Sequence, residues 1–229
     1  MTTAQSDLRP SCVPLDVYPP QEDSQLLIDI AAKSGALAGR EVADLCTGSG
    51  VVGIAAAAAG ARNVRAFDLC PQAVQAAKSN AAVAGVEVSV HLGPWTRAAE
   101  FAPYDVVLSN PPYVPDFDDD LEQIPAEAGP PLAYNAGFDG RSILDPLCRT
   151  VGDLLAPNGV FFLVHSEFSG VERSLQLLQG SGLSADVVAR QAIPFGPVLR
   201  ARAAWLERVR LLEPGRRVEE LIVIRADKP

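Results

Sequence analysis

Short apolar segments that alternate with amphipathic ones form the main pattern of this 229-residue chain. Seven segments are brief, apolar and rich in β-branched or aromatic residues, which is typical of strands. They cover residues 42–45, 64–67, 86–91, 104–109, 160–164, 183–189 and 219–225. Strands that alternate with helical patterns favour a mostly parallel sheet with helices on both faces. We therefore expect an α/β fold.

The segments between these strands carry helix signals. Pro71 opens one helix and Gly85 stops it, because proline suits the first helical position and glycine the position past the end. Further helical patterns cover part of residues 16–37, the alanine-rich stretch that ends at Gly60, and residues 141–155 and 200–211. No internal repeat or linker interrupts the pattern. We expect a single domain over residues 1–229, in which residues 1–37 form an N-terminal loop and helix.

The composition argues against a membrane-spanning, secreted or metal-binding protein. Hydrophobic residues make up 48% of the chain, yet no run of apolar residues is long enough to span a membrane. The first ten residues lack the basic and apolar blocks of a secretory signal. The four cysteines show neither metal-binding nor disulfide spacing. These features predict a cytoplasmic protein with reduced cysteines and no metal of its own.

The net charge of −9 counts against a protein that holds duplex nucleic acid through its phosphates. Charged residues gather in two segments. The acidic group comprises Asp116, Asp118, Asp119, Asp120, Glu122 and Glu127, and the basic group comprises Arg200, Arg202, Arg208, Arg210, Arg216 and Arg217. We expect both on solvated faces. An acidic rim that attracts a basic substrate is the alternative for the first group. Residues 125–131 are proline-rich and predict a loop near a site.

The segment Asn110-Pro111-Pro112-Tyr113 follows the strand at residues 104–109. The two prolines restrict the backbone, and Pro111 also restricts Asn110. The turn offers the amide oxygen of Asn110, the carbonyl of Pro111 and the flat face of Tyr113. Such a set suits a planar nitrogen group with hydrogens to donate. The alternative is an ordinary exit from a strand into a turn.

A second motif, residues 44–50, combines a strand end, a glycine turn and a helix start. Gly48 and Gly50 let the backbone approach a ligand closely, and the helix start favours an anionic group. Asp44 could receive an ammonium group. Asp68 closes the next strand, about twenty residues beyond the glycines, where a carboxylate binds ribose hydroxyls. The spacing differs from the dinucleotide fingerprint G-x-G-x-x-G. It favours a ligand with an amino-acid part and a nucleoside, which is S-adenosylmethionine.

Together these motifs resemble the class I S-adenosylmethionine-dependent methyltransferases that act on nitrogen. Residues 17–24 (Val-Tyr-Pro-Pro-Gln-Glu-Asp-Ser) and 137–140 (Gly-Phe-Asp-Gly) further resemble the HemK family of protein N5-glutamine methyltransferases, in its short archaeal and eukaryotic-type branch. The resemblance implies a Rossmann-like seven-stranded sheet with an antiparallel last strand. It also implies S-adenosylmethionine as cofactor and S-adenosylhomocysteine as product.

The resemblance assigns roles by position. It implies that residues 1–37 close over the cofactor, with Asp44 and the turn at its methionine end, Asp68 at the ribose and Trp95 near adenine. The implied cofactor-binding residues are Ser24, Asp44, Cys46, Gly48, Gly50, Asp68, Trp95 and Asn110, and the implied catalytic residues are Asn110, Pro111, Pro112 and Tyr113. The chain departs from the family pattern at Cys46, where a glycine is usual, and at Pro94, where an acid is usual. His91 and His165 are expected to be structural.

The function implied is methylation of a glutamine side-chain nitrogen in a protein, with a translation release factor as the family's usual target. Lysine methylation belongs to the same branch. Eukaryotic-type relatives work with a small zinc-binding activator protein. Three alternatives stay open: N6-adenine or RNA methylation, methylation of a small molecule, and a non-catalytic binding module. A base-flipping enzyme usually carries a basic recognition surface, for which length and charge leave little room.

Overall fold

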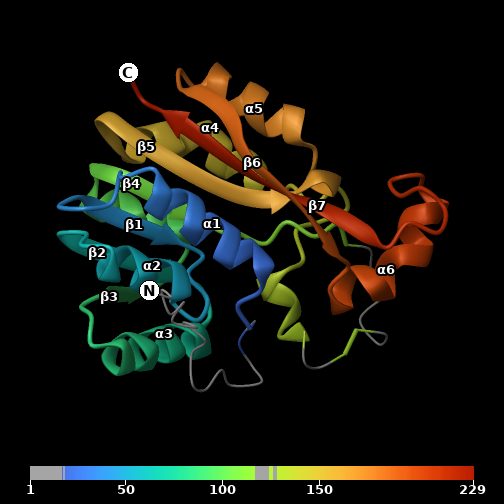
Figure 1. Ribbon diagram of the computed structural model, residues 1–229, viewed down its shortest axis with the longest axis horizontal. Helices are drawn as coiled ribbons and strands as arrows, with labels where there is room; N and C mark the ends of the chain where they lie inside the picture. The colour runs from blue at the N-terminus through green and yellow to red at the C-terminus, as the bar shows by residue number, and fades with distance from the viewer. Residues whose placement is uncertain (1–16, 18, 117–123, 126–127) are drawn as a thin grey trace, which may run out of the picture.

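The computed structural model describes residues 17, 19–116, 124–125 and 128–229. Seven strands form one sheet in the order β3-β2-β1-β4-β5-β7-β6 (Figure 1). Their bounds are β1 (Glu41–Leu45), β2 (Asn63–Asp68), β3 (Ser89–Leu92), β4 (Tyr104–Ser109), β5 (Leu155–Ser166), β6 (Ser184–Pro194) and β7 (Val218–Asp227). Neighbours from β3 to β5 pair in parallel, and β7 pairs antiparallel with both β5 and β6. The predicted Rossmann-like sheet, with its antiparallel last strand, is confirmed.

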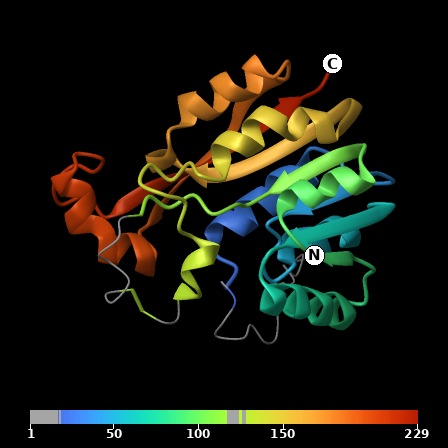
Figure 2. The same ribbon diagram turned by 180° about the vertical axis from the view of Figure 1, so that it is seen from behind.

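Helices cover both faces of the sheet (Figures 1 and 2). On one face lie α1 (Glu22–Lys33), α2 (Val51–Ala58) and α3 (Pro71–Ala84), and on the other lie η1 (Trp95–Phe101), α4 (Leu144–Leu154) and α5 (Val171–Gly180). The central strands therefore bury both faces, which explains their continuous apolar runs. A last helix, α6 (Pro197–Arg208), lies beyond the carboxyl ends of the strands (Figure 1). Among the described residues, no helix is long and apolar enough to cross a membrane.

The bounds of several elements differ from the sequence prediction: β5 begins at Leu155 instead of residue 160, and β6 ends at Pro194 instead of residue 189. Two further differences have a local cause. The third strand begins at Ser89 instead of residue 86, because the Val86 N–H caps α3 through the Ala81 carbonyl. Helix α5 had no counterpart among the predicted segments. Its buried positions are Val171, Ser174 and Leu178, and a serine in the middle of the buried face weakens the apolar signal.

The order of the strands creates a crevice between β1 and β4. These two strands are parallel neighbours, and Leu45 pairs with Ser109 at their carboxyl ends. The Ser109 hydroxyl donates a hydrogen bond of 3.0 Å to the Leu45 carbonyl, which holds the two ends together. After β1 the chain continues to α2 on one face of the sheet, and after β4 it continues to α4 on the other face. Open α/β sheets bind ligands at such a switch point, so the two sequence motifs emerge side by side where a site is expected.

Candidate active site

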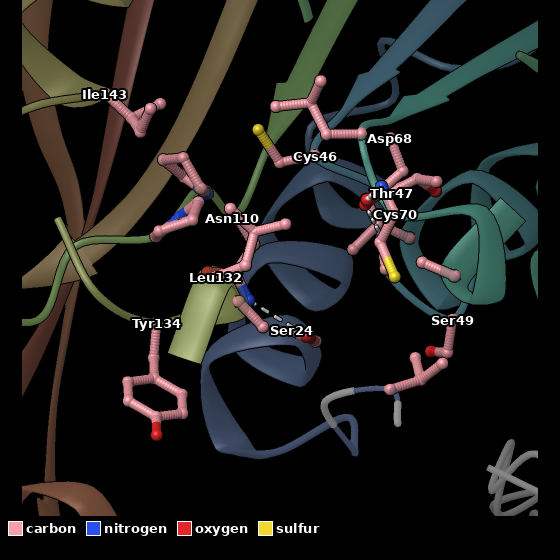
Figure 3. Close-up of a pocket in the computed structure, with 18 of the residues that line it drawn as sticks. Ser24, Cys46, Thr47, Ser49, Asp68, Cys70, Asn110, Leu132, Tyr134 and Ile143 are labelled. Carbon is pink, nitrogen blue, oxygen red and sulfur yellow. Dashed lines mark hydrogen bonds between the residues drawn. The ribbon is translucent and has the colours of Figure 1, made fainter. Parts of the chain in front are cut away.

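A cavity of about 200 Å³ opens at this switch point. It collects residues from the starts of α1, α3 and η1 and from the turns after β1, β2 and β4. The predicted site residues that line it are Ser24, Asp44, Cys46, Gly48, Asp68, Trp95, Asn110, Pro111, Pro112 and Tyr113. In Figure 3, Asn110 and Tyr134 lie on one side of the cavity and Asp68, Cys70 and Ser49 on the other, with Ser24 of α1 between them. The fold thus brings together distant parts of the chain; Asp23 and Tyr113, which share a hydrogen bond, are 90 positions apart.

The side-chain amide of Asn110 has a fixed orientation. Its nitrogen Nδ2 donates a hydrogen bond of 3.1 Å to the hydroxyl of Ser24, at the start of α1. Because this bond uses the donor end of the amide, the carbonyl oxygen Oδ1 remains to accept hydrogen bonds from a ligand. Ser24, expected from the sequence to bind cofactor, is therefore in direct contact with Asn110, which was expected to serve in both cofactor binding and catalysis.

Tyr113 is held on both its side chain and its backbone. Its hydroxyl donates to Oδ2 of Asp23 at 3.0 Å, and its backbone carbonyl accepts from the Ser169 hydroxyl at 2.6 Å. Asp23 is buried and also accepts from the backbone N–H of Ser24. A hydrogen bond to a buried carboxylate is stronger than a neutral one. Helix α1 is thereby fastened to both ends of the asparagine turn, through Ser24 to Asn110 and through Asp23 to Tyr113.

The Gly-Phe-Asp-Gly segment at residues 137–140 packs against the asparagine turn. Gly140 has φ +71°, and a Cβ there would overlap the Tyr113 carbonyl oxygen. Only glycine allows this approach. Asp139 accepts from the backbone N–H of Arg141, whose buried guanidinium then bonds Asp145 and the Ser169 carbonyl. This second signature therefore builds the floor beneath the asparagine turn.

The loop before this segment forms one wall of the cavity. Val114 exchanges backbone hydrogen bonds with Tyr134 and Ala136, which stitches the loop to the asparagine turn. The described part of the proline-rich stretch contributes Pro130 to the cavity lining, so its predicted place near the site is confirmed. Five of the six acidic residues noted after the turn lie outside the described residues; the sixth is Asp116.

Arg202 of α6 locks the same loop. It is fully buried, and its guanidinium donates to the Pro115 carbonyl and to the side chains of Asp116 and Asn135. The guanidinium also lies over the Tyr134 ring at 5.6 Å. The expectation of a solvated basic face is therefore wrong for this residue. A buried charge needs such partners, and here Pro115, Asp116 and Asn135 supply them.

Asp44 presents a buried carboxyl group to the cavity. Its Oδ2 accepts from the Thr47 hydroxyl and from the Gly53 backbone N–H at 2.8 Å. Burial away from water raises the pKa of Asp44 to about 7, although these two hydrogen bonds oppose the rise. A cation that entered the cavity would favour the ionised form. The chemistry of this position therefore suits an ammonium group.

Asp68 ends β2 and faces the glycine turn. Its two oxygens accept from the backbone N–H groups of Gly48 and Cys70, at 2.8 and 2.9 Å. Burial raises the pKa of Asp68 as well, and the backbone bonds oppose the rise. Each carboxylate oxygen keeps a second lone pair, and two such acceptors in a fixed plane suit a pair of vicinal hydroxyls.

The glycine turn holds two unusual positions. Gly50 lies outside the cavity lining; with φ +85° it starts α2, and a Cβ there would lie 2.9 Å from the Ala77 Cβ. Its place in the structure is at the contact of α2 with α3. Cys46 adopts φ +60°, which glycine adopts freely and which other residues rarely adopt. The family's usual glycine thus corresponds to a real backbone requirement, met here by a cysteine.

Other lining residues were not named individually from the sequence, although Thr47 lies within the predicted turn and Asp23 is a neighbour of Ser24. They include Asp23, Thr47, Leu132, Tyr134 and Ile143. Asp23 stands within the N-terminal signature, next to Ser24, so that signature was the available signal. Leu132, Tyr134 and Ile143 carried none, because only loop packing brings them to the cavity. Neither His91 nor His165 lines it; His91 stacks on Phe67, and burial lowers the pKa of His165 to about 4.

Known proteins resemble this chain in sequence and in fold. Residues 27–111 match the family model of the ribosomal protein L11 methyltransferase. A solved structure, the Mtq2–Trm112 complex of E. cuniculi responsible for methylation of the eRF1 translation termination factor, has the same fold. The two chains share 22% identity with a TM-score of 0.63, and the match covers 93% of this chain and 99% of the other.

Two relatives by sequence carry related names. A release factor glutamine methyltransferase of Shewanella oneidensis is 30% identical over 70% of this chain, which spans 57% of that relative's length. A putative protein N5-glutamine methyltransferase of Methanocaldococcus jannaschii is 31% identical over 79% of this chain and 87% of its own length. The chain therefore belongs to the HemK family of protein N5-glutamine methyltransferases, which are S-adenosylmethionine-dependent enzymes.

Proposed function

We propose that this protein transfers a methyl group from S-adenosylmethionine to the side-chain amide nitrogen of a glutamine in a translation release factor. The observation that carries the proposal is the fixed amide of Asn110, whose donor end is bound to Ser24 at 3.1 Å. This arrangement presents an acceptor to an incoming N–H group. The names of the relatives supply the substrate class.

The residues that line the cavity match the parts of S-adenosylmethionine. Asp44, with a pKa raised by burial to about 7, would pair with the ammonium group of the methionine part. Asp68 lines the same cavity and would accept the two ribose hydroxyls, while the Gly48 and Cys70 N–H groups hold its two oxygens in place. Trp95 lines the same cavity and would pack against adenine. Pro94 replaces the usual acid, so adenine recognition would depend on Trp95 and on backbone groups.

When bound, this cofactor supplies a methyl group on a positively charged sulfur. An amide nitrogen is a poor nucleophile because its lone pair is delocalised, so positioning must provide much of the rate. We infer that Asn110 Oδ1 and the Pro111 carbonyl each accept one N–H of the glutamine. These acceptors hold the nitrogen in line and offset the positive charge that develops on it. Tyr113, fixed by Asp23, would pack against the planar amide. The proton becomes acidic only after transfer, and solvent can then remove it.

Nucleic-acid methylation finds less support. The net charge is −9, and the C-terminal arginines that the described residues include are largely engaged. Arg202 is buried, Arg216 pairs with Glu167 and Arg217 pairs with Glu207. Such pairs leave less free positive charge for phosphates.

We further propose that a small activator protein binds along β3. Among the described residues, this strand is at the edge of the sheet and pairs only with β2, so they leave one side of its backbone open to another strand. Leu92 at its end is 48% exposed. A Leu92→Glu variant should capture less activator while its affinity for S-adenosylmethionine is unchanged. Equal capture by the variant would count against this surface.

Radiolabelled methyl transfer into a lysate, followed by separate protease and nuclease digestion, tests the proposed function. The label should disappear with protease and survive nuclease; the reverse would refute a protein substrate. Asn110→Ala should lower kcat at least about 100-fold, as loss of a preorganised polar group typically does, with little change in cofactor affinity. Asn63→Ala, at the exposed start of β2, is the matched control and should remain fully active.

A further inference from the structure

A second, smaller cavity adjoins the first. Its volume is about 40 Å³, and it lies between the start of α1, the asparagine turn, the end of β6 and the starts of α6 and β7. Asp23, Tyr113, Val114 and Tyr134 line both cavities, so they form the shared wall. A group bound in the second cavity would therefore lie next to the proposed methyl acceptor.

Glu219 is the polar side chain that enters this cavity from β7. Glu219 pairs with Ile193 of β6. Two residues further on, Leu221 pairs with Ser166, the last residue of β5, so Glu219 lies at the carboxyl edge of the sheet. The residue is only 6% exposed. Ser166 makes a side-chain hydrogen bond to its carboxylate. The second oxygen, Oε2, has no hydrogen-bond partner among the described residues. A buried carboxylate oxygen left in this state is costly, which points to a ligand.

The surroundings of Glu219 are acidic. Asp23 is buried in the same cavity, and Glu22 stands at its exposed rim. Burial, together with the nearby carboxylates of Asp23, Glu167 and Glu22, raises the pKa of Glu219 to about 7. No lysine, arginine or histidine is found among the described residues that line the cavity. A cation would supply the missing partner and restore the ionised form.

The size and walls of the cavity restrict this cation. A single water needs roughly 10–15 Å³ of cavity, so a volume of about 40 Å³ suits the head of a lysine or arginine side chain and is too small for a nucleobase. Tyr113 and Tyr134 supply aromatic rings, which attract cations. Glu22 and Pro194 are exposed, so the mouth can be reached from solvent.

We propose that this second cavity is a substrate subsite in which Glu219 binds the basic side chain of a residue near the methylated one. The inference rests on the proposed function for its substrate, since it deepens the recognition of a protein at the same site. It explains how the enzyme would select one glutamine: the amide enters beside Asn110 while a neighbouring lysine or arginine enters beside Glu219.

Kinetics on paired variants test the subsite. Glu219→Gln keeps an oxygen for Ser166 and removes the charge. Glu220→Gln, one residue on, is the matched control, because Glu220 pairs with Arg190 and lies outside both cavities. The substrate is the release factor of the same organism, with each lysine and arginine that flanks the methylated glutamine changed singly to alanine.

For the wild-type enzyme, one substrate variant should raise KM about tenfold or more, with kcat unchanged. Glu219→Gln should show the same high KM with the unmodified substrate. When the enzyme variant acts on that substrate variant, KM should rise no further than with either change alone. Its cofactor affinity should match that of Glu220→Gln, and its melting temperature should be no lower, because removing a buried carboxyl group with a raised pKa does not destabilise the fold. A wild-type KM for Glu219→Gln, or two effects that add in full, would overturn the subsite.

NMR titration of the full chain with agmatine and with butylamine tests the subsite independently of methyl transfer. Saturable binding to the wild type and to Glu220→Gln, and its loss in Glu219→Gln, would support the subsite even if no glutamine were methylated. Preference for agmatine would assign it to arginine, and preference for butylamine to lysine. If neither probe distinguishes Glu219→Gln from the wild type, the subsite is refuted while the methylation assay still decides the function.

Discussion

Replacing Asp44 with asparagine should make the ligand-free protein more stable at neutral and higher pH. Burial raises the pKa of this carboxyl group from 3.8 to about 7. Between these values the unfolded chain carries an ionised Asp44 and the folded chain keeps the proton. The folded state therefore binds more protons, and the free energy of unfolding falls as pH rises through this window. At about 1.4 kcal/mol for each pKa unit, the loss approaches about 4 kcal/mol above pH 7.

The asparagine that Asp44→Asn introduces keeps a carbonyl oxygen for Thr47 and the Gly53 N–H but carries no charge. Urea unfolding of both proteins without cofactor, at a series of pH values, gives the two free energies. Asp68 and Glu219 also have raised pKa values, but both proteins contain them, so their effects cancel in the difference. Relative to the wild type, the free energy of unfolding of the variant should rise by up to about 4 kcal/mol from acidic to mildly basic pH.

A difference between the two proteins that stays constant with pH would refute this reasoning, because it would mean that the pKa of Asp44 is the same in the folded and unfolded states. The same variant should bind S-adenosylmethionine at least about 30-fold more weakly in calorimetry, because the ammonium group loses its partner. Gain of stability together with loss of binding would identify Asp44 as a residue kept for its ligand at a cost to the fold.

Three further changes test the support of the asparagine turn. Tyr113→Phe removes the hydrogen bond to Asp23 and should lower the free energy of unfolding by about 1–3 kcal/mol in urea titrations; no change would mean that this bond contributes nothing. Gly140→Ala should cost about 2 kcal/mol more than Gly137→Ala, since both glycines have positive φ but only Gly140 meets the Tyr113 carbonyl; equal melting temperatures would contradict this. Arg202→Met leaves three acceptors without their donor and should cost about 3–5 kcal/mol, with a larger fall in methyl transfer than in cofactor affinity; an unaltered kcat would show that the loop needs no such lock.

The strands and the two motifs could be predicted because each depends on neighbours in the chain. The strand at residues 104–109 and the helix at residues 71–84 have the bounds expected from apolar runs and from Pro71 and Gly85. The third strand was placed three residues early, because apolar periodicity does not record that Val86 caps a helix. Helix α5 escaped prediction because one position on its buried face is a serine.

The sequence by itself determined the chemistry available to this protein: a rigid asparagine turn, an acid before a glycine turn and an acid after the next strand. These are short-range patterns, legible because backbone restriction and strand ends act over a few residues. Only the tertiary structure decided which groups meet. The bond from Asn110 to Ser24 joins residues 86 positions apart, and Arg202 reaches Asp116 over the same separation. Such contacts depend on the order of strands and the packing of helices, which no local pattern encodes. For the same reason, Glu219 looked like one more polar residue of a C-terminal strand until the fold buried it beside Tyr113.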